Sequence, residues 1–119
     1  MPRDLVIGID SSTTATKAIA FDAKGRAVAE GRAAQALHNP KPGWFEQRVE
    51  DWTGSLDIAL RQLTKKVSAD RIAALAITNQ RESFALFDAK DRPLRPGTLW
   101  LDERSYREVD ELSALLGAD

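Results

Sequence analysis

Three short apolar runs separated by turn residues open the chain. The run Leu5–Ile9 alternates large and small residues as a buried strand does, and Lys17–Phe21 and Ala27–Gly31 continue the pattern. The intervening stretch Asp22–Gly25 has the composition of a tight turn. This pattern predicts an antiparallel meander of three strands joined by two tight hairpins.

Helical spacing replaces the strand pattern in the middle of the chain. Apolar residues recur every three or four positions over Val49–Val67, which predicts a helix with Trp52 on its packed face. The β-rich run Ile72–Ile77 then predicts a strand that returns to the same sheet by a right-handed crossover. A last helix is predicted over Arg104–Leu116, with Gly117 as its cap.

The remaining segments are less regular. Two prolines in His38–Gly43 predict an exposed loop, in which the histidine is also exposed. Short strands are predicted at Phe84–Phe87 and Leu99–Trp100, separated by the turn Asp88–Arg92. A meander, a helix and a returning strand, with a carboxylate at the end of the first strand, together describe an α/β protein with a ribonuclease-H-like or actin-like core.

Composition narrows the class of protein. The 119 residues are 43% hydrophobic and 29% charged, as expected of one compact globular domain. The 17 Lys and Arg against 18 Asp and Glu leave a net charge of −1, which provides no electrostatic footprint for nucleic acid or an anionic membrane. The absence of cysteine excludes disulfides, a thiol nucleophile and zinc–thiolate sites. With no signal peptide or membrane-spanning run, we expect a cytoplasmic protein that binds a small molecule.

The first strand delivers a carboxylate and then a cluster of hydroxyls to a turn. Asp10 is followed by Ser11–Thr14, and Lys17 lies three residues beyond. A carboxylate at a strand end can hold Mg²⁺ through water, and small hydroxylated residues leave backbone N–H groups free to surround phosphate oxygens. Neither a P-loop nor a G-x-G-x-x-G motif is present, and the same residues also suit a capped turn without a ligand.

Four segments, taken in order, resemble the start of carbohydrate kinases of the FGGY family: Gly8–Ala18, Pro42–Gln47, Ile77–Ser83 and Pro93–Arg104. The resemblance implies an actin-like ATPase fold with a mixed sheet, and assigns residues 1–119 to the N-terminal portion of the first kinase domain. It also implies that the catalytic base and a second domain are absent, so the end at Asp119 is a truncation or a natural early stop. The isolated chain is therefore expected to be inactive.

The resemblance also implies a set of phosphate-binding residues. Asp10 is expected beside the metal and the transferring phosphate, with Thr13 and Thr14 in contact with the phosphates of ATP. Lys17 replaces the arginine that is usual in the family, and it keeps the charge without the bidentate fork. ATP and Mg²⁺ are therefore the expected nucleotide and metal, with Asp10 as the metal ligand.

The acceptor site implied by the resemblance consists of Arg81, Glu82 and Trp100. A guanidinium only donates hydrogen bonds and a carboxylate only accepts them, so this adjacent pair can satisfy neighbouring hydroxyls. Trp100 would place an apolar face against the carbon chain. The pair matches glycerol-kinase-like members rather than xylulokinase-like ones, which favours a glycerol-like or other polyol pocket. Without the motif, Arg81 and Glu82 would be a solvated surface pair.

These features predict part of a kinase that transfers the γ-phosphate of Mg-ATP to a sugar or polyol hydroxyl, with glycerol, a pentulose and a tetritol all open. The phosphate-binding and acceptor residues should then face one cleft. A second possibility is a non-catalytic fragment or binding remnant of such a kinase. A ribonuclease-H-like nuclease would need more carboxylates and a basic face, which the near-neutral charge disfavours. Apolar surface exposed by truncation would favour a homo-oligomer.

Overall fold

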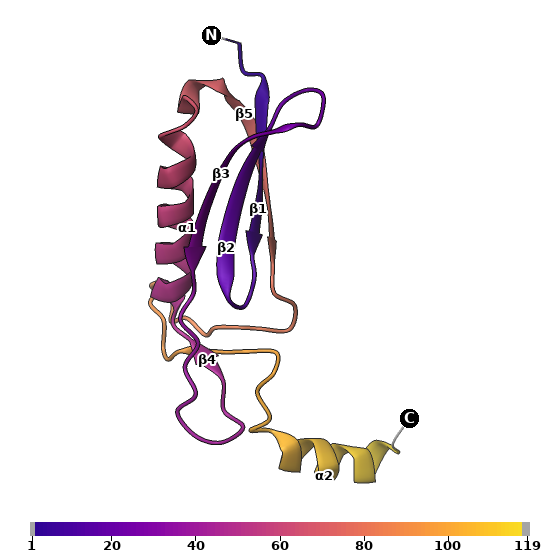
Figure 1. Ribbon diagram of the computed structural model, residues 1–119. Coiled ribbons are helices and arrows are strands. Elements are labelled where there is room, and N and C mark those ends of the chain that lie inside the picture. Colours follow the sequence, from indigo (N-terminus) through magenta and orange to yellow (C-terminus); the bar gives the residue numbers. More distant parts are fainter. Residues whose placement is uncertain (1, 118–119) are drawn as a thin grey trace.

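One α-helix lies along a four-stranded sheet, and a second helix projects from one end of the molecule (Figure 1). The computed structural model describes residues 2–117. Met1, Ala118 and Asp119, the residue at which a truncation or early stop was predicted, lie outside the described residues. In chain order the elements are β1 (Leu5–Ser11), β2 (Ala15–Phe21), β3 (Ala27–Ala34), β4 (Glu46–Gln47), α1 (Val49–Thr64), the short 3₁₀ helix η1 (Ala69–Arg71), β5 (Ile72–Asn79), β6 (Gly97–Thr98) and α2 (Tyr106–Leu116). Within residues 2–117, no helix combines the length and the apolar character that a bilayer crossing requires.

The larger sheet has the strand order β3-β2-β1-β5. The pairs β1–β2 and β2–β3 are antiparallel, whereas β5 runs parallel to β1 after the chain has passed through α1. The predicted meander, the returning strand and the α/β fold class are therefore confirmed. Both β2 and β3 are longer than predicted, because Ala15 pairs with Ala34 and extends their ladder beyond Lys17 and Gly31.

The core lies between α1 and the sheet face that this helix covers (Figure 1). Its buried members are Ile7, Ile9, Ala18, Ala20, Ala29, Ala59 and Leu63. Small residues let the helix approach the strands closely, and a Cβ atom at Gly31 would lie only 1.9 Å from the carbonyl oxygen of Ala59. The glycine in β3 therefore sets the distance between this strand and α1.

Helix α1 begins at the predicted residue, Val49, and ends three residues before the predicted end. The N–H groups of Lys66 and Val67 both donate to the carbonyl oxygen of Leu63, at 2.9 and 3.2 Å. This tight turn ends the helix after Thr64, because the residues that follow must reverse direction to reach β5.

The segment between β5 and α2 has less regular structure than predicted. Within the described residues, the run Phe84–Phe87 forms no strand and makes only isolated bridges, to Thr98 and Pro93. The strand predicted at Leu99–Trp100 is also wrong: the pairing lies just before it, in β6, whose partner β4 was not predicted. Proline supplies no N–H donor, so the prolines of this segment limit how far such ladders extend.

The proline-containing loop is irregular as predicted, but His38 within it is half-buried. Its backbone pairs with Glu46, and its ring nitrogen Nε2 lies 2.9 Å from a carboxylate oxygen of Asp51 in the first turn of α1. The prediction that this histidine is exposed is therefore only partly right: the side chain is 40% exposed, and the contact with Asp51 holds one side of the ring against the helix.

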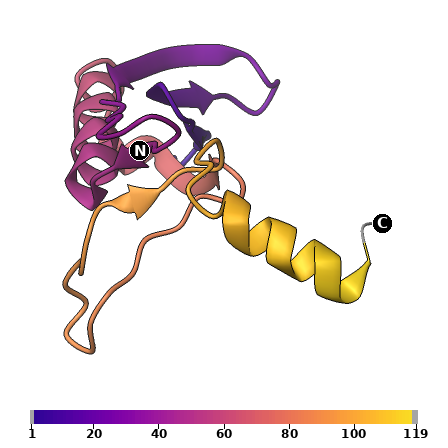
Figure 2. The same cartoon turned by 90° about the horizontal axis from the view of Figure 1, so that it is seen from below.

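Helix α2 begins at Tyr106, two residues later than predicted, and ends just before Gly117. Figure 2 shows it pointing away from the sheet. Apolar side chains are exposed on this helix and on β5: Val109, Leu112, Leu115, Leu116, Leu75 and Ile77. The described residues therefore leave two apolar surfaces uncovered, one on α2 and one on β5.

Candidate active site

The turn after β1 and the loop after β5 meet at one edge of the sheet, because parallel strands end on the same side. Ser11, the last residue of β1, pairs with Asn79, the last residue of β5. The carbonyl oxygen of Ser11 also accepts the N–H of Gln80 at 3.2 Å. Open α/β sheets bind ligands at this edge, where the carboxyl ends of their strands lie.

Hydrogen bonds close the hydroxyl-rich turn between β1 and β2. The backbone N–H and the hydroxyl of Ser12 both donate to the carbonyl oxygen of Ala15, at 3.0 and 3.1 Å. The carbonyl oxygen of Thr14 accepts the N–H of Gln35 at 2.9 Å, and Thr14 itself is exposed. The shape of the turn is therefore determined by bonds within the protein, independently of any ligand.

Four of the predicted site residues line one hollow, of about 380 Å³, which we call the Thr13–Trp100 hollow. It is lined by Ser12, Thr13, Gln80, Arg81, Glu82 and Trp100. The indole Nε1 of Trp100 donates to the hydroxyl Oγ1 of Thr13 at 2.9 Å, which joins two walls of the hollow. The backbone N–H of Trp100 also donates to the hydroxyl of Ser83 at 3.1 Å, so the tryptophan is held at two points.

Arg81 and Glu82 are exposed within this hollow. Among residues 2–117, no ion pair joins either of them to another side chain, so both charged groups can bind a ligand. The backbone of Glu82 has a φ of 64°, in the left-handed region that non-glycine residues seldom adopt. Such conformations cost on the order of 1–3 kcal/mol and occur preferentially at functional sites.

Asp10 and Lys17 line a different hollow, of about 300 Å³, together with Thr78. The two residues pair across β1 and β2, and the hydroxyl of Thr78 lies 3.4 Å from a carboxylate oxygen of Asp10. Because side chains alternate along a strand and Ile9 packs in the core beneath α1, Asp10 points to the opposite face of the sheet. The seven predicted residues therefore do not all share one cleft, and the exposed Thr14 lines neither hollow.

A buried polar network behind the turn was not predicted from the sequence. Gln35 is 7% exposed, and its Nε2 donates to the carbonyl oxygen of Ser12 at 2.8 Å and to the hydroxyl of Thr16 at 3.0 Å. The Thr16 hydroxyl lies 2.7 Å from the hydroxyl of Ser55 in α1. These bonds tie the turn to the helix. No pattern in the sequence distinguishes Gln35 from a surface glutamine.

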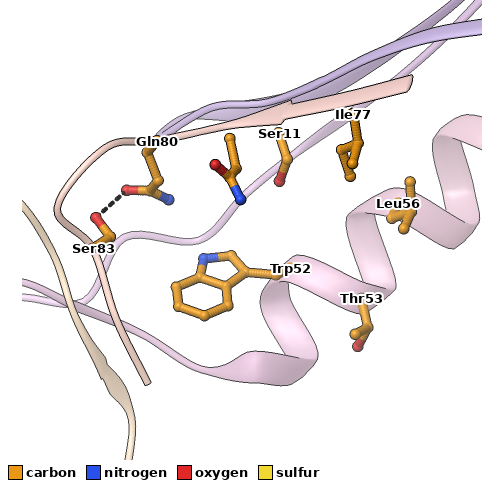
Figure 3. Close-up of a pocket in the computed structure, with 8 residues that line it drawn as sticks. Ser11, Trp52, Thr53, Leu56, Ile77, Gln80 and Ser83 are labelled. Atoms are coloured by element: carbon orange, nitrogen blue, oxygen red, sulfur yellow. Dashed lines mark hydrogen bonds between the residues drawn. The ribbon is translucent and has the colours of Figure 1, made fainter. Parts of the chain in front are cut away.

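Figure 3 shows a third pocket, of about 200 Å³, between α1 and the end of β5. It is lined by Ser11, Trp52, Thr53, Leu56, Ile77, Asn79, Gln80 and Ser83. Trp52, predicted on the packed face of the helix, is only half-buried and lies outside the core. It lines this pocket instead, and its Nε1 donates to the side chain of Gln47 at 2.7 Å. Gln47 is fully buried and was missed as a site residue, although it ends one of the segments that carry the family resemblance.

The segment that follows Trp100 is anchored by a cluster of charges. The carboxylate of Asp102, 2% exposed, accepts the N–H of Phe45 at 2.7 Å and the guanidinium of Arg104 at 2.6 Å. The Arg104 guanidinium, against the opposing effect of burial, lowers the pKa of the Asp102 carboxyl to about 2. Arg104 also pairs with Glu46 in β4 at 2.9 Å. The cluster locks the chain after Trp100 onto β4.

Comparison with known proteins assigns this arrangement to a class. Residues 5–119 match the family model for the N-terminal domain of the FGGY family of carbohydrate kinases. Glycerol kinase from Beutenbergia cavernae is 38% identical over 98% of this chain and 24% of its own length. The crystal structure of xylulose kinase from Rhodospirillum rubrum matches with a TM-score of 0.89 and 30% identity, over 95% of this chain and 24% of that one. Plasmodium falciparum glycerol kinase with ADP matches with a TM-score of 0.80 and 29% identity, over 92% and 23%.

Fold and comparisons together define a carbohydrate kinase domain built on the actin-like ATPase fold. The chain belongs to the FGGY family of carbohydrate kinases, as the sequence motifs predict. It spans 24% of the length of the Beutenbergia relative.

Proposed function

We propose that this chain forms part of a kinase that transfers the γ-phosphate of ATP to a hydroxyl of a small polyol or sugar. The observation that carries the proposal is the 2.9 Å contact between Trp100 Nε1 and Thr13 Oγ1. It joins the hydroxyl-rich turn, which suits phosphate, to the hollow that contains Arg81 and Glu82, which suit hydroxyls. Phosphoryl transfer depends on such proximity of donor and acceptor.

The proposed acceptor site combines a hydrogen-bond donor, a hydrogen-bond acceptor and an apolar ring. Arg81 donates hydrogen bonds to acceptor oxygens, Glu82 accepts hydrogen bonds from hydroxyl protons, and Trp100 covers the carbon chain. The exposed state of the two charged side chains supports this assignment, because they are available to a ligand. A polyol such as glycerol is the acceptor we favour, and the names of the relatives support a glycerol-like choice.

The proposed phosphate site lies along the β1–β2 hairpin: Asp10 and Lys17 line one hollow on its strands, and Thr13 and Thr14 lie in the turn beyond them. Within residues 2–117, no three His, Asp or Glu side chains converge into an all-protein metal site. A single carboxylate beside a hydroxyl fits Mg²⁺, which keeps most of its water and is bound largely through substrate phosphates. Bound beside Asp10, Mg²⁺ would neutralise charge on the phosphoryl oxygens.

We further propose that the chain is an incomplete first kinase domain, and that the catalytic base and a second domain lie on other residues. The uncovered apolar surfaces of α2 and β5 support this proposal, because both are suited to packing against further protein. The isolated chain is then expected to be inactive. Its cytoplasmic location and its self-association stay predictions.

The direct test is a chimera in which residues 1–119 replace the matching segment of Beutenbergia cavernae glycerol kinase, which aligns with 98% of this chain. The purified chimera is incubated with ATP, Mg²⁺ and glycerol, xylulose or erythritol, and phosphorylated product is measured. We expect ATP-dependent phosphorylation of at least one acceptor. The unaltered glycerol kinase is the positive control. A folded chimera that phosphorylates none of the three would contradict the proposal and favour a non-catalytic remnant.

A further inference from the structure

A single buried amide connects three parts of the candidate site. Gln47 is 0% exposed, and its Nε2 donates to the carbonyl oxygen of Thr13 at 2.7 Å. Its Oε1 accepts two hydrogen bonds, from Trp52 Nε1 at 2.7 Å and from Gln80 Nε2 at 2.9 Å. The side chain therefore joins the hydroxyl-rich turn, helix α1 and the residue that directly precedes Arg81.

The main chain of Gln47 adds a fourth connection. It pairs with Gly97 in the β4–β6 ladder, three residues before Trp100. A Cβ atom at Gly97 would lie 2.6 Å from the ring of Trp52, so the close approach of this strand to that ring favours glycine. The strand that leads to Trp100 is thus held against the same tryptophan that Gln47 binds.

The contacts of Gln47 require an uncharged group with both a donor and an acceptor. A carboxylate would turn a second oxygen toward the Thr13 carbonyl oxygen, and a hydrocarbon would leave buried polar groups unpaired. Gln47 does not line the Thr13–Trp100 hollow, so it is not placed to touch a substrate there. Its position suits control of geometry rather than direct participation in the reaction.

We propose that Gln47 is a positioning residue, which sets the distance between the phosphate-binding turn and the Arg81–Glu82 pair. This inference rests on the proposed function. The hydroxyl of Thr13 bonds to Trp100, so a shift of the Thr13 carbonyl moves two walls of the hollow relative to Arg81. Phosphoryl transfer is sensitive to such shifts, because a misplacement of about 1 Å can lower a rate about 100-fold.

The geometric part of the proposal is tested on the 119-residue chain with ¹⁵N-labelled tryptophan. Gln47→Met keeps the length of the side chain and removes its polar atoms, and Gln47→Glu keeps the acceptor and removes the donor. Gln62→Met is the matched control, because Gln62 is exposed and accepts the N–H of Arg32 away from the site. We expect both Gln47 variants to shift the indole N–H resonance of Trp100, and the control to leave it unchanged.

Circular dichroism establishes that each variant is folded. If the buried charge of Gln47→Glu prevents folding, Gln47→Met decides the question, because it introduces no charge. A Trp100 resonance at its wild-type position in a folded Gln47 variant would overturn the proposal, since Trp100 reports on the turn through its bond to Thr13.

The functional part is tested in the chimera with glycerol kinase. We expect Gln47→Met to lower kcat about 10- to 100-fold at a temperature where the variant is fully folded. A purely structural role would lower the melting temperature and leave kcat unchanged, and that result would overturn the positioning role. An inactive wild-type chimera would instead contradict the proposed function, and the Trp100 resonance would still decide whether Gln47 controls the turn.

Discussion

The indole of Trp100 donates a hydrogen bond to the hydroxyl of Thr13, 87 positions away in sequence, at 2.9 Å. Thr13 lies in the turn after β1, which the parallel pairing of β1 with β5 places beside the loop after β5. Trp100 lies in the segment after β6 and is held at that loop by the bond from its backbone N–H to Ser83. The bond closes one side of the hollow that contains Arg81 and Glu82. It is therefore the contact on which the proposed alignment of phosphate and acceptor depends.

Replacement of Trp100 by phenylalanine tests this contact. Trp100→Phe keeps an aromatic face and removes the N–H donor, so we expect kcat/KM of the chimera to fall by up to about tenfold, equivalent to about 0.5–1.5 kcal/mol for one neutral hydrogen bond. Trp44→Phe is the matched control, because no hydrogen bond from the Trp44 indole is found within residues 2–117. Equal losses in the two variants would show that the bond to Thr13 does not contribute.

Removal of the Arg81 guanidinium should weaken binding of the acceptor. In the chimera, Arg81→Ala is expected to lower kcat/KM about 10- to 100-fold, equivalent to about 1.5–3 kcal/mol, mainly through a higher KM for the acceptor. Arg92→Ala is the control, because Arg92 is 71% exposed and pairs with Asp88 outside the hollow. Kinetics are measured with glycerol, xylulose and erythritol. Unchanged KM and kcat/KM for every accepted substrate would identify Arg81 as a surface residue.

Loss of the Asp10 carboxylate should act on the chemical step. We expect Asp10→Ala to lower kcat of the chimera about 100-fold, the scale observed when one group that stabilises transition-state charge is removed, with little change in the acceptor KM. Asp57→Ala is the control, because Asp57 is exposed on α1. Initial rates are measured across a range of Mg²⁺ concentrations. A wild-type dependence on Mg²⁺ in Asp10→Ala would contradict the assignment of Asp10 to the metal.

The close packing of β3 against α1 predicts opposite effects of two glycine substitutions. Gly31→Ala places a Cβ atom 1.9 Å from the Ala59 carbonyl oxygen, so we expect the free energy of unfolding to fall by about 1–3 kcal/mol or more. Gly54→Ala, in α1, meets no atom within 4 Å and should raise it by about 0.5–1 kcal/mol. Urea unfolding of both variants gives the two values. A Gly31→Ala variant as stable as the wild type would contradict the close approach of β3 to α1.

The low pKa of Asp102 predicts a loss of stability in acid. A carboxyl whose pKa is lower in the folded state binds protons more readily when unfolded, so its contribution is complete above about pH 4 and is lost as the pH falls toward 2. The expected contribution is about 2 kcal/mol, for a pKa lowered from 3.8 to about 2. Urea unfolding at pH 2 to 5 should therefore show a weaker pH dependence in Asp102→Asn than in the wild type. Identical pH dependence in the two proteins would contradict the role of Asp102.

Local pattern in the sequence determined the meander and helix α1. The period of two in Leu5–Ile9 and the period of three to four from Val49 onward reflect burial of one face against one core, so they are visible without knowledge of the partner. Family motifs then indicated the family, which the comparisons confirm, and the candidate residues around Asp10 and Arg81, whose roles stay predictions. The predictions of secondary structure were least accurate between β5 and α2. The pairings there are two-residue strands and isolated bridges, which are too short to produce a periodic pattern of apolar residues in the sequence.

Only the tertiary structure decided which of these residues meet. Asp10 and Thr13 are three positions apart, yet they line different hollows, because Asp10 is still in a strand with alternating faces and Thr13 lies in the turn beyond it. The contacts of Thr13 with Trp100 and Gln47 join residues far apart in sequence. Such bonds depend on strand order and on the parallel register of β1 with β5, which long-range packing determines and local residue patterns do not contain.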